Sequence, residues 1–385
     1  MNRKRLAIGF VLGCVLLLGA APTVAAQPAA AAPTATRLVT GLAGGAGSAI
    51  GPDGALYVTE TMAGRITRVD PRTGATSTFA SGLPRLNPAV GLGGAFDVAF
   101  LGSTAYALVT LVGADTGGKD KVGLYRVDGP DRFTVVADIG AFSVANPPKI
   151  AFKIDVPSGV QYALEPFQGG FLVTDGHLNR VLRVTVDGKV SEVIAFGNTA
   201  PTGLAVAGTR VYMGEAGPVP HLPADGKVLA FEANAPAAAT VASGAPLIVD
   251  VEVGPGGQIF ALAQGAFTPG DAAGAPAKPN SGTLVLADGR GGFTVVYGPL
   301  DRPTSLEFIG DTAYVVTLAG DIVKIAGIPG PPAAPATGTG GNLPGMPNTG
   351  AGGGQARLPG GWLLLGAAGA LAGGAGLLRR RARRA

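Results

Sequence analysis

A strand-turn-strand phrase recurs six times along this chain and sets the main constraint on its fold. Each copy has a short strand, a Gly-rich turn and an apolar strand centred on an aromatic residue or a leucine, as in residues 48–59. The central residues are Tyr57, Tyr106, Leu172, Tyr212, Phe260 and Tyr314. Their spacing averages about fifty residues, which accommodates one four-stranded propeller blade with its loops. The sequence therefore predicts an all-β, six-bladed β-propeller over residues 34–326.

A spare strand near the N-terminus predicts how the ring closes. Third strands follow every central residue, and fourth strands follow in the first five repeats, at 75–80, 133–138, 190–196, 239–242 and 293–297. The sixth repeat ends at Ile325 without a fourth strand, whereas residues 35–41 precede the first repeat and resemble residues 76–82. We expect residues 35–41 to pair with the sixth repeat, because this pairing removes an exposed sheet edge. The alternative, an open β-sandwich, leaves the spare strand unexplained.

The first residues predict export. A basic start precedes an apolar stretch over residues 6–20, and a small-residue cleavage site ends at Ala26, before Gln27. This order is typical of a signal peptide covering residues 1–26. Lipidation at Cys14 is the alternative, but the residues around this cysteine depart from a lipobox. Cleavage after Ala26 removes the only cysteine, so the mature chain can form no disulfide.

The charge distribution argues against nucleic acid as a partner. The formal net charge is +4, but three basic residues lie in the predicted signal peptide and five arginines lie at the C-terminus. Without these eight, 21 Lys and Arg stand against 25 Asp and Glu, a net charge of −4. A phosphate-binding surface needs clustered basic side chains, which this body of the chain lacks.

The C-terminal segment has the order of a surface-anchoring signal. The pentapeptide Met346-Pro347-Asn348-Thr349-Gly350 precedes a Gly-rich spacer, an apolar run over 362–378 and an arginine cluster. It resembles a sortase sorting signal of the Leu-Pro-x-Thr-Gly kind, which implies cleavage between Thr349 and Gly350 by a sortase-type transpeptidase. The threonine would then join the cell envelope. We expect residues 327–345 to be a Gly/Pro-rich linker and residues 346–385 to hold the signal, with a short hydrophobic helix. A plain membrane anchor is the alternative, although so short an apolar run spans a bilayer only marginally.

Several phrases carry a resemblance to a known family. Residues 172–184 look like an NHL-type repeat, and three further phrases resemble the ScyD/ScyE family of exported bacterial propellers: Asp97 to Phe100, Tyr212 to Glu215 and Ile248 to Gly257. The resemblance spans all six repeats and implies a propeller, without a defined activity. The chain departs from the family at residues 160–163 and in the short loop at residues 61–64.

Six polar side chains are candidates for a binding site. Two histidines and two acids fall on neighbouring loops of the third and fourth repeats, and two aspartates are expected at the entrances of innermost strands. These loops and entrances share one face of a propeller, where ligands usually bind. The candidates are Asp97, Asp175, His177, Glu215, His221 and Asp250.

The residue types suggest two kinds of chemistry. Histidine and carboxylate groups together can bind a divalent cation such as Ca²⁺ or Zn²⁺, or act as acid and base. The alternative is a solvated rim, in which Asp175 and Asn179 accept hydrogen bonds from turn backbone. Acids crowded at the channel mouth also predict raised carboxyl pKa values and a preference for a cation or a cationic ligand.

Enzyme signatures are absent from the sequence. The chain contains no Gly-x-Ser-x-Gly, His-Glu-x-x-His or phosphate-binding loop. Calcium-dependent lactonases with six-bladed propellers are similar, but they have Glu-Gly-Pro where this chain has Ala46-Gly47-Ser48. We therefore expect a non-catalytic, monomeric, exported protein anchored to the cell wall or membrane, which binds a small molecule, glycan or protein. The alternative is a metal-dependent lactonase or other hydrolase.

Overall fold

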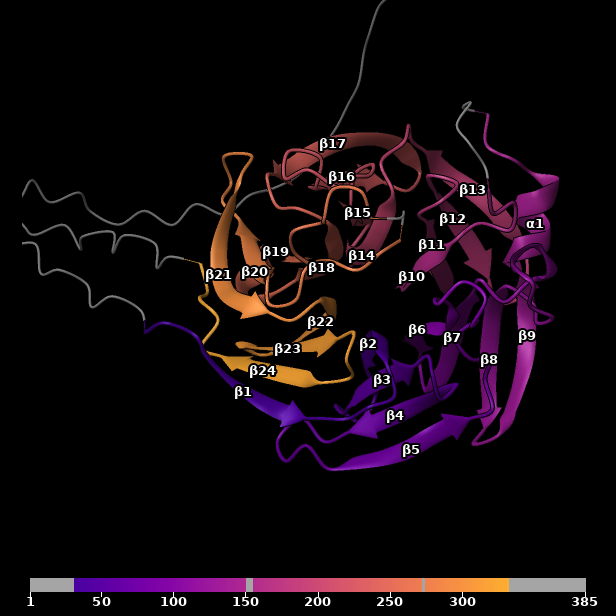
Figure 1. Ribbon diagram of the computed structural model, residues 1–385, viewed down its shortest axis with the longest axis horizontal. Helices are drawn as coiled ribbons and strands as arrows, with labels where there is room; N and C mark the ends of the chain where they lie inside the picture. Colours follow the sequence, from indigo (N-terminus) through magenta and orange to yellow (C-terminus); the bar gives the residue numbers. More distant parts are fainter. Residues whose placement is uncertain (1–30, 150–154, 272–273, 332–385) are drawn as a thin grey trace, which may run out of the picture. The chain divides into compact units, whose positions relative to one another are not determined.

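Six four-stranded antiparallel sheets follow one another around a common centre (Figure 1). The computed structural model describes residues 31–149, 155–271 and 274–331. The predicted six-bladed β-propeller is confirmed. The signal peptide, the sorting motif and the C-terminal hydrophobic segment lie outside the described residues. Within the described ranges, no helix is long and apolar enough to cross a membrane.

In each blade the innermost strand lies at the centre and the other three follow outward. Blades 1 to 3 comprise β2 (Gly45–Ile50), β3 (Leu56–Glu60), β4 (Arg65–Val69) and β5 (Thr76–Ser81); β6 (Gly94–Leu101), β7 (Thr104–Thr110), β8 (Gly123–Gly129) and β9 (Arg132–Asp138); and β10 (Gln161–Phe167), β11 (Gly170–Asp175), β12 (Arg180–Thr185) and β13 (Val190–Ala195). Blades 4 to 6 comprise β14 (Pro201–Ala207), β15 (Arg210–Glu215), β16 (Lys227–Glu232) and β17 (Ala235–Ser243); β18 (Ile248–Val253), β19 (Ile259–Ala263), β20 (Gly282–Ala287) and β21 (Phe293–Leu300); and β22 (Pro303–Ile309), β23 (Thr312–Thr317), β24 (Ile322–Ala326) and β1 (Thr34–Val39).

The N-terminal strand closes the ring, as predicted. β1 pairs antiparallel with β24, with Thr34 opposite Ala326. Val39 is buried and packs in one apolar cluster with Tyr314 and Ile322. β1 begins and ends slightly earlier than the predicted segment 35–41. Gly41 has a φ of 79°, a left-handed conformation that turns the chain after the strand.

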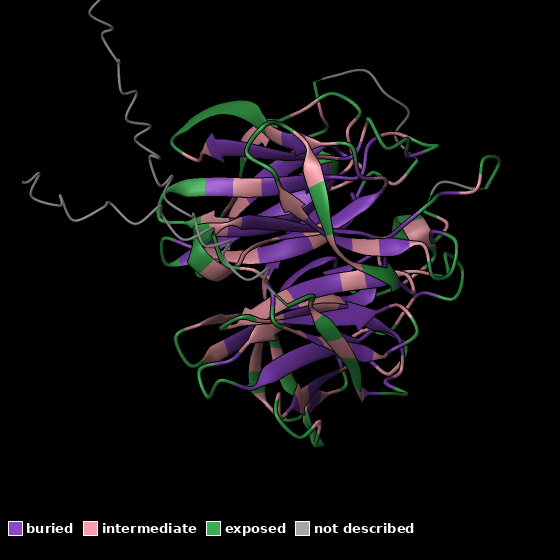
Figure 2. Ribbon diagram, turned by 90° about the vertical axis from the view of Figure 1, so that its left-hand side faces the viewer, coloured by how far each residue is buried: buried purple, intermediate pink, exposed green. Residues whose placement is uncertain are grey.

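The outer strands differ most from the prediction. β17 and β21 are longer than the predicted 239–242 and 293–297. The first residues of β17 are exposed alanine and proline, so no apolar alternation marks them in the sequence. Figure 2 shows the same trend in the molecule: exposed residues gather on outer strands and loops, and buried residues lie within the sheets.

Short helical segments interrupt the all-β pattern. α1 (Ile139–Ala145) connects blades 2 and 3, and two 3-10 turns cover Ala114–Thr116 and Pro255–Gly257. α1 was not predicted. Its N-cap is Asp138, the last residue of β9, whose Oδ1 accepts a hydrogen bond of 2.9 Å from the Ala141 N–H.

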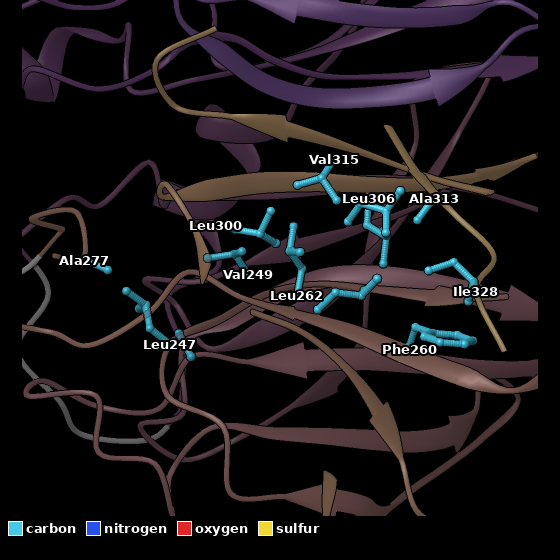
Figure 3. Packing of buried hydrophobic residues seen from close by; sticks show 13 residues of the cluster. Leu247, Val249, Phe260, Leu262, Ala277, Leu300, Leu306, Ala313, Val315 and Ile328 are labelled. Carbon is cyan, nitrogen blue, oxygen red and sulfur yellow. The ribbon is translucent and has the colours of Figure 1, made fainter. Parts of the chain in front are cut away.

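Apolar side chains pack between adjacent blades and hold the ring together. The cluster between blades 5 and 6 contains Phe260 and Leu262 from β19 with Leu306 from β22 and Val315 from β23 (Figure 3). All four side chains have no exposed surface. Burial of a leucine or phenylalanine contributes about 1.5–3 kcal/mol, so each interface between blades adds substantially to stability. This packing fixes where the six innermost strands stand.

Candidate functional site

Each innermost strand carries two positions that are equivalent from blade to blade. One position pairs with the central residue of the repeat on the next strand, and we call the six residues at this position the second set. The other position stands two residues earlier in the chain, and its six residues are the first set. The first set is Gly47, Asp97, Ala163, Gly203, Asp250 and Ser305. The second set is Ala49, Ala99, Glu165, Ala205, Glu252 and Glu307. Four blades therefore contribute five carboxyl groups.

Asp97 and Asp250 do not stand at strand entrances, which corrects the prediction. Asp97 is the fourth residue of β6 and Asp250 is the third residue of β18. A β-bulge precedes each aspartate and places two residues opposite one on the partner strand. Each carboxyl reaches the following blade.

Both aspartates accept hydrogen bonds from the innermost strand of the next blade. Asp97 Oδ2 accepts from the Leu164 N–H in blade 3 at 2.7 Å, and Asp250 Oδ2 accepts from the Leu306 N–H in blade 6 at 2.7 Å. The remaining oxygens accept from the N–H of Val98 and Val251. An innermost strand has an unpaired edge, so these carboxyls satisfy N–H groups that the sheet leaves free.

In the blade before each aspartate, the equivalent position is a glycine, because a larger residue would clash there. A Cβ atom on Gly47 would overlap the Asp97 carboxyl, and a Cβ on Gly203 would overlap the Asp250 carboxyl. The order Gly47, Asp97, Ala163 in blades 1 to 3 thus returns as Gly203, Asp250, Ser305 in blades 4 to 6. The residues at this position therefore repeat approximately every three blades around the channel.

The acids surround a cavity of about 280 Å³ in the central channel. Asp97, Glu165, Asp250, Glu252 and Glu307 all line it. Its other polar contributions are the Ser48 and Ser305 hydroxyls, which lie 2.8 Å apart, and the remaining lining is mainly aliphatic. None of its sixteen lining residues is Lys, Arg or His. The cavity is therefore surrounded by carboxyl groups without a balancing cation.

Burial and mutual repulsion raise the carboxyl pKa values in this cavity, as the crowding of acids predicts. Burial is the main cause for every group. It raises the pKa of Asp250 to about 7, although the N–H groups of Leu306 and Val251 act in the opposite direction. Burial, Asp97 and Asp250 together raise the pKa of Glu165 to about 8.

The two remaining glutamates behave in the same way. Burial raises the pKa of Glu252 well above its ordinary value, with further contributions from Glu307, Glu165 and Asp250. Burial also raises the pKa of Glu307 well above its ordinary value, with Asp250, Glu165 and Asp97 adding to the shift. The pKa values of all five groups therefore lie above those of free carboxyls, although each of these residues keeps some exposed surface.

A smaller hollow of about 30 Å³ adjoins the same two aspartates. Its lining includes Phe96, which precedes Asp97 in β6, and Tyr162, which precedes Ala163 in β10. The two rings meet edge-on at a centroid distance of 5.2 Å. Burial, followed by Asp250 and Asp97, raises the Tyr162 pKa. The two rings thus lie beside the two aspartates on the side of the strand entrances.

The other four predicted residues form no single group with the channel aspartates. Asp175 and Glu215 end the second strands β11 and β15, opposite the first residues of β10 and β14. Asp175 Oδ1 accepts from the N–H groups of Val160 and Leu178. Asn179 Oδ1 accepts from two further backbone N–H groups. Asp175 and Asn179 thus accept hydrogen bonds from backbone, as the alternative predicted, but both side chains are buried, so the predicted solvated rim is wrong for these two residues.

Both histidines are also engaged with backbone. His177 Nε2 accepts from the N–H groups of Asp155 and Val156 at 3.2 Å. His221 Nδ1 lies 3.2 Å from the Ala216 carbonyl oxygen, and its ring meets Phe267 edge-on. Within the described ranges, no group of three or more His, Cys, Asp or Glu side chains is placed to hold a metal ion.

Glu165, Glu252 and Glu307 were missed in the sequence analysis. A recurrent signal marks them: each follows an apolar residue and stands opposite the repeat's central residue, as in Leu164-Glu165, Val251-Glu252 and Leu306-Glu307. The other three blades have alanine at this position. An aligned comparison of the six repeats would have exposed these acids.

No family model and no curated protein sequence matches the chain. Solved structures are similar in fold. A gluconolactonase from Xanthomonas campestris is 12% identical, with 76% of this chain and 89% of that chain covered and a TM-score of 0.52. A luciferin-regenerating enzyme is 11% identical, with 76% and 95% covered and a TM-score of 0.53. At these identities the likeness concerns the propeller fold alone.

Proposed function

We propose that this protein is a non-catalytic, surface-displayed binding module of the ScyD/ScyE kind, acting as a monomer, and that its central cavity takes a small organic cation. The observation that carries this proposal is the enclosure of one cavity by five carboxyl groups from four blades, with no basic residue in its lining. A positively charged ligand lowers the repulsion among these groups, whereas an anion raises it.

The cavity suits an ammonium or guanidinium group on a short aliphatic chain. Its volume of about 280 Å³ is small for a ligand pocket. Carboxylates accept the charged N–H donors of such groups in short, strong hydrogen bonds. Ile50, Val98 and Leu204 also line the cavity and offer apolar surface to methylene groups.

An organic cation fits the site better than a coordinated metal ion. Ca²⁺ takes six to eight oxygen ligands at short distances, and Zn²⁺ takes four ligands in a tight tetrahedron. The described part of the chain offers no group of three ligating side chains at such distances. A metal-dependent lactonase is therefore the less favoured function.

Surface display completes the proposal. We propose that a signal peptide is removed before Gln27, and that a sortase-type transpeptidase joins Thr349 to the cell envelope. The order of motifs in the sequence supports this attachment. β1 and β24 pair in blade 6, so the chain enters and leaves the propeller at one blade, as suits a single tether.

Calorimetry with the full-length chain tests the ligand class. Butylguanidinium should bind, and butylurea, its neutral counterpart of the same shape, should not. Glu252→Gln with Glu307→Gln should weaken butylguanidinium binding at least about tenfold, because each loses a charged acceptor. Asp131→Asn is the matched control, since Asp131 is an exposed acid in a hairpin outside the cavity. Equal binding of butylguanidinium and butylurea would refute the proposal, and tight Ca²⁺ binding would restore the enzyme alternative.

A further inference from the structure

The geometry of the cavity acids points to a regulatory property of the channel. We propose that the five carboxyl groups take up and release protons as one coupled unit, so that binding of a cation expels protons and occupancy of the cavity rises with pH. This inference rests on the proposed function, because it concerns regulation of the same cavity.

The first argument is that two of the acids cannot move apart. Asp97 and Asp250 each have both carboxyl oxygens bonded to backbone N–H groups, one on their own strand and one on the next blade. Rotating either carboxyl out of the channel would leave N–H groups without partners, at a cost in stability. Gly47 and Gly203 also pack directly against these carboxyls. The negative charges of an ionised pair therefore stay where they are.

The second argument is that no described residue lining the cavity carries a compensating positive charge. Blade 1 contributes Ser48 and blade 4 contributes Leu204 to the cavity, while blades 2, 3, 5 and 6 contribute the acids, with the Ser305 hydroxyl in blade 6. Tyr162, on the side of the smaller hollow, is the remaining titratable group beside Asp97 and Asp250. All titratable groups lining the two hollows are thus acids or a phenol.

The negative charges of the five carboxyl groups must then be neutralised by protons or by a bound cation. Groups that interact this closely titrate together, and their protons leave in shared steps. Burial raises the pKa of Asp250 to about 7, and burial with repulsion from Asp97 and Asp250 raises that of Glu165 to about 8, which puts these steps near neutral pH. In acid the cavity holds protons and is nearly neutral. At higher pH its ionised form attracts a cation more strongly.

The same groups affect stability in a defined direction. Their folded pKa values lie above the unfolded values near 4, so the folded chain binds more protons than the unfolded chain between those pH values. Their contribution to stability is fully present below about pH 4 and is lost as pH rises through about 7 to 8. A bound cation should offset this loss at high pH.

Calorimetry across pH 5 to 8 tests the inference on the full-length chain. Butylguanidinium is a suitable probe, because its guanidinium stays charged throughout. The affinity should rise about tenfold per pH unit for each proton expelled. The binding heat should also change with the ionisation enthalpy of the buffer. Glu165→Gln, with one acid fewer, should release fewer protons, whereas the exposed control Asp131→Asn should behave like the unaltered chain.

The possible outcomes separate the two proposals. Binding that is tight at all pH values, with no buffer-dependent heat, would overturn the coupling but leave the proposed function standing. Absence of binding at every pH would overturn both. An independent readout needs no ligand: the thermal midpoint should fall between pH 5 and 8, and less steeply in Glu165→Gln. A midpoint with the same pH profile in Glu165→Gln would also overturn the coupling.

Discussion

Asp97 and Asp250 occupy equivalent positions in opposite blades, and each carboxyl accepts a 2.7 Å hydrogen bond from the innermost strand of the following blade. The two residues therefore join blade 2 to blade 3 and blade 5 to blade 6 at the centre of the ring. They also face the same cavity, where both repel Glu165 and Glu307. The same two side chains thus link neighbouring blades by hydrogen bonds and supply carboxyl groups to the cavity.

Replacing Gly47 by alanine should destabilise the propeller by about 1–3 kcal/mol, because the added Cβ would overlap the Asp97 carboxyl. Urea unfolding measures this change. Gly197→Ala is the matched control, since a Cβ there meets nothing within 4 Å, and it should change stability by less than about 0.5 kcal/mol. Equal effects of the two substitutions would contradict the steric explanation.

Converting Asp97 and Asp250 together to asparagine should lower the pKa of Glu165, because both aspartates contribute to its elevation. Burial is the larger cause and remains, so the pKa should stay above the ordinary glutamate value. Carbon-detected NMR of the Glu165 carboxyl across pH measures the shift. An unchanged titration would show that the two aspartates do not act on Glu165. Weaker binding of butylguanidinium by the folded double variant is also expected.

Deleting residues 34–39 should lower stability by about 3–5 kcal/mol, since the ladder with β24 and the buried Val39 contacts disappear together. The deletion also exposes a sheet edge and should promote association. Thermal unfolding and light scattering follow the two effects. Arg37→Ala is a control within the same strand, because Arg37 is exposed and should change stability little. Unaltered unfolding of the deletion would disprove the role of β1 in closure.

Glu60 should show the opposite pH dependence to the cavity acids. Burial raises its pKa, but hydrogen bonds from Arg65, Thr67 and the Ala43 N–H outweigh burial and hold the value below the ordinary one. Its contribution to stability is thus present above the unfolded pKa, near 4, and is lost as pH falls through the folded value. Glu60→Gln should cost about 1–3 kcal/mol at pH 7 and less at pH 2 to 3. A cost that does not change with pH would contradict this account.

If the sorting proposal holds, mass spectrometry of envelope-bound protein should find a chain that begins at Gln27 and ends at Thr349. Thr349→Ala should abolish covalent attachment, because the threonine carbonyl is the group transferred to the envelope. Asn348→Ala is the matched control, since it changes the variable position of the motif. Surface protein that retains the arginines at 379–384 would favour the plain membrane anchor instead.

The fold and the site differ in how far local sequence predicts them. The spacing of Tyr57, Tyr106 and their equivalents reports a local unit of strands and turns, and the ring follows from counting such units. The placement of β1 can also be predicted from the sequence, because the sixth repeat lacks a fourth strand and the N-terminal segment can supply it. The length of β17 cannot be predicted from the sequence, since its exposed alanines show no alternation of apolar and polar residues.

The candidate site depended on contacts between distant repeats. Asp97 and Asp250 were identified as candidates, but their position within the strands and their hydrogen bonds to the next blade were not predicted. His177 was a plausible metal ligand in the sequence, yet the structure brings two backbone N–H groups to its Nε2.

By itself, the sequence determined the number of blades and the closing strand, because turn residues, alternation and repeat length act over short distances. Only the tertiary structure decided that Glu165, Glu252 and Glu307 join Asp97 and Asp250 around one cavity. Ring closure brings strands from separate repeats to a shared axis, and packing between blades sets the distances there. The resulting burial raises the carboxyl pKa values, an effect that depends on the surroundings of a residue rather than on its neighbours in the chain.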